Sequence, residues 1–319
     1  MVYTEIQKRQ AKNYHYLVHT IRLGSKYKKI RVFLGVNLKG VLLDEKITAK
    51  KTILEEKIQL YKETECFKSN ITFNKPILTQ KQRTKIKSIM KSYCQKITVT
   101  DKDVLRKVRE SFLIKFTYHT NHAEGNTISL KETELIVKKG IVPKSHSLRE
   151  VHEIENTVKA YEYIETYNGT LRHDFILKLH ELVTKNTMEN AKNEGSYRKK
   201  GQNVAMIGSE HFPPKGGRQI KKLIDKLIQE YTYSTLSVFE NIVLFHSAFI
   251  LIHPFMDGNG RVSRLMFNWM MIKNNLPPLD FPSKEHIEYT DVMEISRNGD
   301  AIPLADFLYH RLLEQFENG

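Results

Sequence analysis

Apolar residues recur at helical spacing over most of the chain from about residue 46 onward. In each such segment the apolar side chains stand three or four residues apart with charged residues between them, which predicts amphipathic helices. The segments with this pattern are residues 47–65, 82–93, 101–120, 148–167 and 173–186. Residues 239–252 and 262–269 are apolar almost throughout and predict two helices buried in the core. The pattern therefore predicts a mainly α-helical domain over residues 46–319.

The N-terminal region, residues 1–45, shows a different pattern. Apolar and polar residues alternate over residues 14–18 and again over 30–34, and Gly24-Ser25 between them can turn the chain. This alternation predicts a β-hairpin. Its many lysines and arginines would line a ribbon able to contact nucleic acid; the alternative interpretation, a small solvated sheet packed on the main body, is favoured.

A second departure from the helical pattern is residues 196–219. The short apolar run Val204–Ile207 lies between glycines, and Pro213-Pro214 follows it. This arrangement predicts a second β-hairpin on the helical domain.

Composition narrows the class of protein. The chain has 319 residues, of which 40% are hydrophobic and 27% charged, as in ordinary globular proteins. No apolar run approaches the roughly 20 residues that span a bilayer, and the N-terminus lacks the apolar core of a signal peptide. Cys66 and Cys94 form no metal or disulfide pattern, so we expect a cytoplasmic protein with no membrane partner. The net charge of +15 favours an acidic ligand or nucleic acid, unless it only reflects a lysine-rich composition.

Candidate chemistry is concentrated between the two apolar helices, in the sequence HPFMDGNGRVSRLM. Gly258, Asn259 and Gly260 lead directly into a helix, whose first backbone N–H groups have no intrahelical acceptor. Such a helix N-terminus binds anions, and Arg261 and Arg264 add positive charge on its first turn. The segment therefore predicts a site for several phosphates.

Two neighbouring residues supply the rest of a phosphate-transfer site. Asp257 offers carboxylate oxygens to a Mg²⁺ ion that bridges phosphates, and His253 is a proton acceptor at neutral pH. A base beside a phosphate site and its metal indicates nucleotidyl or phosphoryl transfer. A metal-dependent phosphohydrolase with His246, His253 and Asp257 as ligands is an alternative, although it leaves the glycines and the two arginines unexplained.

The pattern His-x-Phe-x-Asp-Gly-Asn-Gly-Arg-x-x-Arg, complete over residues 253–264, resembles the signature of the Fic family. Fic enzymes transfer AMP from ATP to hydroxyl groups of proteins. Doc-type kinases have a lysine where this chain has Gly260, so the resemblance is to the adenylylating branch.

The resemblance implies a role for each motif residue. His253 is expected to be the catalytic base, Asp257 the Mg²⁺ ligand, and Phe255 a core anchor. The residues expected to bind the ATP phosphates are Gly258, Asn259, Gly260, Arg261 and Arg264.

The resemblance covers about residues 100–310 and implies a Fic-type helical bundle with a small β-hairpin flap over the site. The flap is expected at residues 203–212, and Tyr289 matches a tyrosine that lines the adenine pocket, although it is also consistent with an ordinary surface tyrosine. The flap residues expected on the nucleotide side are Ala205, Met206, Ile207 and Gly208.

A short motif upstream is similar to the inhibitory motif of Fic proteins. Thr120 is followed four residues later by Glu124 and then Gly125, at the end of a predicted helix over about residues 103–125. We expect Glu124 to pair in a bidentate manner with Arg264, and Thr120 to hold the glutamate. Such a contact would occupy the arginine that the γ-phosphate requires.

The function predicted from the sequence is thus a self-inhibited, Mg²⁺-dependent protein adenylyltransferase that modifies Ser, Thr or Tyr hydroxyls and releases pyrophosphate. The resemblance also implies that such an enzyme can remove AMP, and that it can form a homodimer. The partners expected are ATP and a target protein, which can be the chain itself. The alternative is a DNA-associated regulator that uses the basic hairpin and a nucleotide-sensing Fic domain.

Overall fold

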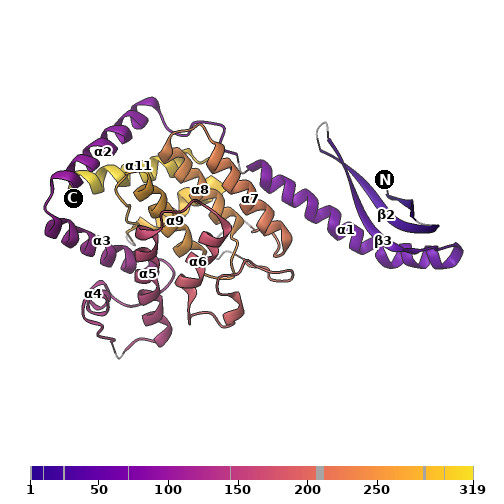
Figure 1. Ribbon diagram of the computed structural model, residues 1–319, viewed down its shortest axis with the longest axis horizontal. Helices are drawn as coiled ribbons and strands as arrows, with labels where there is room; N and C mark the ends of the chain where they lie inside the picture. Colours follow the sequence, from indigo (N-terminus) through magenta and orange to yellow (C-terminus); the bar gives the residue numbers. More distant parts are fainter. Residues whose placement is uncertain are drawn as a thin grey trace. The chain divides into compact units, whose positions relative to one another are not determined.

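The computed structural model describes residues 2–9, 11–23, 26–70, 72–143, 145–205, 212–282, 285–297 and 299–318 (Figure 1). The chain divides into two compact units, Met1–Ser69 and Asn70–Gly319. We call them the N-terminal unit and the helical unit.

The N-terminal unit is an antiparallel three-stranded sheet followed by a long helix. Its elements are β1 (Val2–Arg9), β2 (Lys12–Leu23), β3 (Lys26–Val36) and α1 (Gly40–Asn70), with strand order β1-β2-β3. The predicted hairpin corresponds to β2 and β3. Strand β1 was not predicted, because an edge strand exposes most of its side chains and so lacks a clear apolar alternation.

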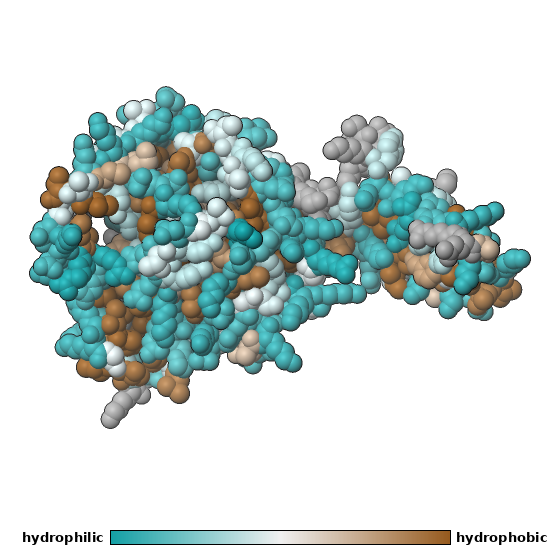
Figure 2. All heavy atoms as spheres, in the orientation of Figure 1, coloured by the Kyte–Doolittle hydropathy of each residue, from teal (hydrophilic) through white to brown (hydrophobic). Residues whose placement is uncertain are grey.

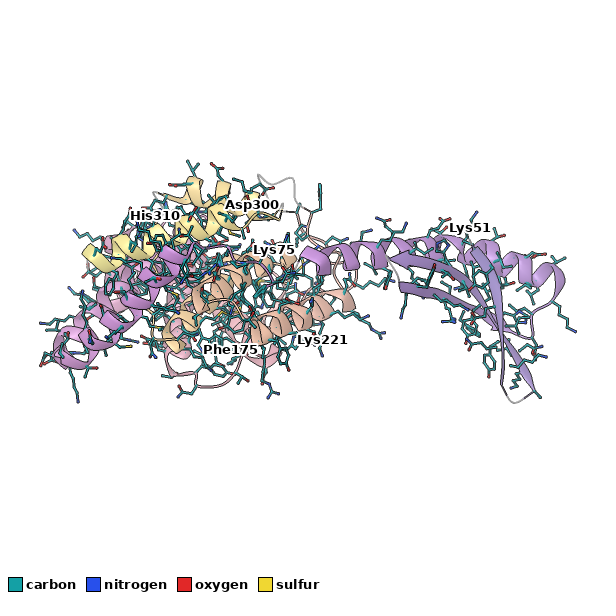
Figure 3. The ribbon with its side chains drawn as sticks, turned by 90° about the horizontal axis from the view of Figure 1, so that it is seen from above. Lys51, Lys75, Phe175, Lys221, Asp300 and His310 are labelled. Carbon is teal, nitrogen blue, oxygen red and sulfur yellow. The ribbon has the colours of Figure 1, made fainter. Side chains whose placement is uncertain are left out.

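Helix α1 packs on one side of this sheet (Figure 3). Leu17, Val32 and Leu34 of the strands form a buried core with Leu38 and with Leu54 of α1. The unit boundary therefore lies after residue 69 and not after residue 45 as the sequence division had it. The apolar side chains of α1 pack against the sheet. Their periodicity predicts a helix but does not show which part of the chain the helix packs against.

The helical unit confirms the predicted mainly α-helical class. Its described helices are α2 (Gln80–Val99), α3 (Lys102–His122), α4 (Leu130–Lys139), α5 (Leu148–Thr166), α6 (His173–Thr184), the short η1 (Ala191–Asn193), α7 (Arg218–Tyr233), α8 (Val238–Ile252), α9 (Asn259–Lys273), α10 (His286–Arg297) and α11 (Ile302–Asn318). Capping boxes begin several of them: in α8, Ser237 accepts from a backbone N–H while Glu240 accepts from the Ser237 backbone. No described helix is long and apolar enough to cross a membrane.

Helices α8 and α9 form the centre of the helical unit (Figure 1). Helix α8 packs against α7, α9, α10 and α11, while α9 packs against α3, α5, α6 and α8. Nearly every residue of both helices is buried, as their apolar sequences predicted. The six-residue turn between them, residues 253–258, is therefore held by a closely packed core.

The predicted flap falls largely outside the described residues. Met206, Ile207 and Gly208 are among those not described, and Ala205 is exposed and outside any strand. The hairpin over residues 203–212 thus stays a prediction.

The hydropathy of the surface is mixed, with separate apolar areas among hydrophilic ones (Figure 2).

Candidate active site

The turn between α8 and α9 requires unusual backbone geometry. His253 ends α8 in the left-handed conformation (φ 49°, ψ 62°) and Gly258 begins α9 with φ 76°. A Cβ at Gly258 would lie 2.9 Å from Cγ2 of Thr184, so both conformation and space favour glycine there. Phe255 is fully buried and stacks on His180 with ring centroids 3.7 Å apart, as expected for a core anchor.

Asn259 closes the turn with its side chain. Its Oδ1 accepts from the Phe255 N–H at 2.9 Å and its Nδ2 donates to the Phe255 carbonyl at 3.0 Å. The amide is therefore used inside the protein, and Asn259 can offer an anion only its backbone N–H. This N–H belongs to the first turn of α9, where no intrahelical acceptor is available.

Arg264 joins α9 to the end of α3. Its Nε donates to Thr120 Oγ1 at 2.8 Å, and its Nη2 donates to the Thr120 carbonyl at 3.0 Å and to Glu124 Oε1 at 2.5 Å. The predicted Glu124–Arg264 pair is present, but through one guanidinium nitrogen and not two. Thr120 binds the arginine instead of the glutamate, because the Arg264 Nε points to its hydroxyl.

Glu124 lies just beyond α3, which ends at His122, and reaches over the first turn of α9. A Cβ built at Gly260 would lie 2.1 Å from Glu124 Oε1, so the carboxylate occupies the space that glycine leaves open. Burial raises the pKa of Glu124, but Arg264 and then Arg261 lower it more, so the net shift is downward. The carboxylate is therefore ionised at neutral pH and sits where the helix N-terminus attracts an anion.

Arg261 is 1% exposed and belongs to an ionic cluster around Asp257. Its Nη1 lies 3.5 Å from Glu153 Oε1 and its Nη2 lies 3.5 Å from Asp257 Oδ1. Arg149 completes the cluster, with Nη2 3.2 Å from Asp257 Oδ2. Among the described residues, Nε and Nη1 of Arg261 have no hydrogen-bond acceptor, which is costly for a buried cation.

The environment of His253 keeps its imidazole neutral. Burial, followed by the guanidinium of Arg198, lowers the pKa of His253 to about 4, although Glu124 opposes the shift. A neutral imidazole at physiological pH is the form that accepts a proton.

Arg198 is a buried residue of the site that the sequence reasoning missed. Its side chain donates to four backbone carbonyls: those of His253 (2.8 Å), Gln202 (3.1 Å), Pro214 (2.8 Å) and Ile252 (3.3 Å). Gln202 and Pro214 lie on either side of the predicted flap. We call this set of contacts the Arg198 clamp, because it ties both ends of the flap segment to the backbone of His253.

His180 is a second missed residue, and it supports the turn from α6. The Gly195 N–H donates to His180 Nδ1 at 3.0 Å, so Nε2 carries the proton and donates to the Asp257 carbonyl at 3.1 Å. Burial lowers the pKa of His180 to about 4, which keeps this tautomer neutral. A histidine on the apolar face of the segment 173–186 was the available signal.

Tyr289 and Arg264 line the same small cavity. Its hydroxyl is 2.6 Å from His246 Nε2, and Ser263 Oγ is 2.7 Å from His246 Nδ1. Both nitrogens of His246 are therefore engaged, and among the described residues no group of three His, Cys, Asp or Glu could hold a metal ion. This contradicts the phosphohydrolase alternative with His246, His253 and Asp257 as ligands.

A small cavity is lined by Tyr289, Arg264, Phe281 and Phe307, among others. The Tyr289 ring lies between those of Phe281 (5.7 Å) and Phe307 (6.1 Å). Its wall is aromatic and adjoins a buried arginine, but the space holds only about one water molecule, so these side chains must move apart before a flat ring can enter.

In a comparison with known families, residues 170–271 match the Fic/DOC family. Among curated proteins, the chain is 30% identical over 212 residues to protein adenylyltransferase fic-1 of Caenorhabditis elegans. It is 29% identical over 213 residues to protein adenylyltransferase Fic of Drosophila willistoni. Each match covers 64% of this chain but only 40% and 41% of the relative, so the chain spans about two fifths of the length of these relatives.

Solved structures agree on the fold. The chain is similar to Fic-1 of C. elegans, with a TM-score of 0.65 at 23% identity over 75% of this chain and 71% of that one. It is also similar to a Fic domain containing signaling protein from Bacteroides thetaiotaomicron, with a TM-score of 0.63 at 22% identity over 74% and 95% of the two chains. The Fic fold predicted from the sequence is confirmed.

Proposed function

We propose that this chain, whose residues 170–271 match the Fic/DOC family, is a self-inhibited protein adenylyltransferase. It moves AMP from ATP to a Ser, Thr or Tyr hydroxyl of a target protein and releases pyrophosphate. Its similarity to proteins named protein adenylyltransferase supports the reaction.

The observation that carries the proposal is the set of hydrogen-bond donors without acceptors at the start of α9, beside the arginines Arg261 and Arg264. Arg261 is almost fully buried, yet its Nε and Nη1 have no acceptor among the described residues. The N–H groups of Asn259 and Gly260 open the same helix, whereas the Gly258 N–H already donates to Asp257 Oδ1. Buried donors without partners are rare unless a ligand completes them, and the chemistry here suits phosphate oxygens.

His253 acts as the general base. The target hydroxyl oxygen attacks the α-phosphorus of ATP, the bond from that phosphorus to the β-phosphate oxygen breaks, and pyrophosphate leaves. The hydroxyl proton passes to the imidazole of His253, which is neutral because its pKa is about 4. The Arg198 clamp on the His253 carbonyl holds the imidazole in place during this transfer.

Asp257 is the residue that would hold a Mg²⁺ ion. Its side chain is 37% exposed at the edge of the ionic cluster, and a Mg²⁺ bound by one carboxylate, phosphate oxygens and water fits a site with a single protein ligand. When bound, the ion neutralises phosphate charge. Arg149 lies on the same carboxylate, so we expect it to turn away when the ion binds.

Glu124 inhibits the enzyme by occupying the place of the γ-phosphate. It contacts Arg264 and covers Gly260, the two groups that this phosphate needs. ATP can then bind only in a pose that leaves the α-phosphate out of line with the incoming hydroxyl. We expect Tyr289 and its aromatic neighbours to take the adenine. From the family resemblance alone, Ala205, Met206, Ile207 and Gly208 of the predicted flap are expected to lie along the nucleotide.

The test uses ATP labelled at either the α- or the γ-phosphate, incubated with the Glu124→Gly chain and separated by denaturing electrophoresis. We expect α-label on protein and none from γ-label, and we expect His253→Ala in the same background to abolish the band. Label from the γ-position would indicate a kinase. The alternative of a DNA-associated regulator that only senses nucleotide predicts no covalent label at all.

Two finer parts of the proposal have their own tests. Removal of AMP from a modified protein should require Glu124, so pre-labelled protein should lose its label with wild type and keep it with Glu124→Gly. Self-association as a homodimer should appear in light scattering as twice the 37.4 kDa chain mass.

A further inference from the structure

The positive charge of the chain is concentrated on the sheet of the N-terminal unit. Residues 1–40 contain nine Lys or Arg and one acid, Glu5, whereas residues 41–69 contain six Lys and six acids. The first 40 residues thus carry +8 of the net +15 in about an eighth of the length. Helix α1 contributes none of the excess, so the sheet is the strongly basic part of this unit.

One face of the sheet is covered by α1 and the other is not covered within the unit. Paired positions share a face, and the register aligns Tyr16 with both Glu5 and Phe33, and Val18 with Arg31. Leu17 and Val32, one residue further along, point to the α1 side. The open face therefore bears aromatic and basic side chains, and Phe33 on it is 48% exposed.

The aromatic rings of the open face lie together. The Phe33 centroid is 5.4 Å from that of Tyr16 and 6.2 Å from that of Tyr14. On the neighbouring part of the face, Lys29 Nζ lies 5.8 Å from the centre of the Tyr3 ring. Rings exposed on a sheet, with cations beside them, are the features by which proteins stack nucleic-acid bases.

The cations on this face are held in fixed positions. Glu5 accepts from Lys29 Nζ at 3.0 Å and from Arg31 Nε at 2.9 Å. Hydrogen bonds from Arg31, then from Gln7 and Lys29, lower the pKa of Glu5 to about 2, so this anchor is ionised at any physiological pH. The side chains of Lys29 and Arg31 remain 47% and 38% exposed. Both cations can therefore meet phosphate groups while Glu5 orients them.

From these observations we infer that the open face of the sheet (Tyr3, Tyr14, Tyr16, Lys29, Arg31 and Phe33) binds single-stranded nucleic acid. Bases stack on the rings, and the phosphates lie along the cations. A single strand is favoured over a duplex because only an unpaired strand exposes base faces to a ring such as Phe33. A purely ionic partner would leave the exposed aromatic cluster without a role.

The test measures binding of the full chain to fluorescein-labelled mixed-sequence RNA and DNA of about 12 nucleotides, single-stranded and duplex, by fluorescence anisotropy. Phe33→Ala should weaken single-strand binding about 5- to 150-fold, the range measured for loss of one stacking ring. Phe33→Leu keeps an apolar side chain without the flat ring, so it should also weaken binding while the melting temperature stays near that of wild type.

A matched pair of charge variants separates the face from general basicity. Arg31→Gln should lower the slope of log affinity against log salt by about 0.7, the contribution of one phosphate contact to a single strand. Lys51→Gln removes the same charge from an exposed position on α1, which packs on the other face of the sheet, and should leave affinity and slope unchanged. His253→Ala should bind like wild type, so this inference stands or falls separately from the adenylyltransferase proposal.

Three results would overturn the inference. One is equal binding of duplex and single strand with no effect of Phe33→Ala, which would indicate contact with phosphates alone. Another is a loss for Lys51→Gln as large as for Arg31→Gln, which would indicate non-specific attraction. The third is no binding of any probe at low salt.

Discussion

Replacing Arg198 by methionine tests whether the Arg198 clamp supports both the fold and His253, the proposed general base. Methionine keeps the length of the side chain but removes all donors to the His253, Gln202, Pro214 and Ile252 carbonyls. A hydrogen bond from a charged donor contributes about 1.5–3 kcal/mol. Burial destabilises the charged guanidinium, as the lowering of the Arg198 pKa to about 10 indicates. This cost offsets part of the stability that the hydrogen bonds contribute.

If only two of the four hydrogen bonds remain after this burial cost is subtracted, the Arg198 clamp contributes about 3 kcal/mol to the free energy of unfolding. A loss of that size should lower the melting temperature of a domain of this length by roughly 6–12 °C in a calorimetric scan. In the Glu124→Gly background, α-labelling should also fall by about 10²-fold, because the His253 backbone is no longer fixed. Lys199→Met is the matched control, since Lys199 is the exposed neighbour and should change neither quantity.

Arg198→Lys sharpens the test, because lysine keeps the charge but cannot reach four carbonyls with one compact ammonium group. The melting temperature and labelling of Arg198→Lys should be closer to those of Arg198→Met than to those of wild type. An Arg198→Met chain that melts within about 2 °C of wild type, with full labelling, would refute the clamp.

The remaining predictions concern the base, the metal ligand and the flap. Because the pKa of His253 is lowered to about 4, its imidazole is neutral above that pH. The rate of labelling by Glu124→Gly should therefore be constant from about pH 6 to 8 and fall only toward pH 4. A midpoint near about pH 6.5 in the pH profile would contradict this. Asp257→Asn should raise the Mg²⁺ concentration needed for half-maximal labelling by at least about tenfold, measured by Mg²⁺ titration, and an unchanged requirement would remove Asp257 as the ligand. Ile207→Glu should spare ATP binding but reduce labelling of protein targets, and unimpaired labelling would remove Ile207 from target alignment.

The sequence predicted the parts of the site that are close together along the chain. The turn at residues 253–258 and the start of α9 depend on local rules: a glycine that tolerates positive φ, an apolar helix on each side, and arginines one turn apart. These rules do not require knowledge of the rest of the fold. The two buried helices and their connecting turn were therefore predictable.

Contacts between distant segments were less predictable. Arg198 matters only because the chain brings residues 202, 214 and 253 around it, and a lone arginine in a polar loop gives no signal of this. The Thr120–Glu124 motif was recognised by resemblance, yet its contacts differ in detail, because the rotamer of Arg264 decides which oxygen each nitrogen meets. The boundary between the two units was also misplaced, because the sequence of α1 has the same helical pattern as the helices that follow it and does not show that α1 packs on the sheet.

The central claim is that Glu124 restrains this enzyme by holding Arg264. The most direct measurement is auto-labelling with α-labelled ATP by wild type, Glu124→Gly and Glu124→Gly/Arg264→Ala, at equal concentrations of folded protein. Loss of one charge-assisted contact of about 1.5–3 kcal/mol predicts roughly ten- to hundred-fold more label with Glu124→Gly. The double variant should lose that gain, because the freed arginine is what positions the γ-phosphate. Equal labelling by wild type and Glu124→Gly would contradict the claim.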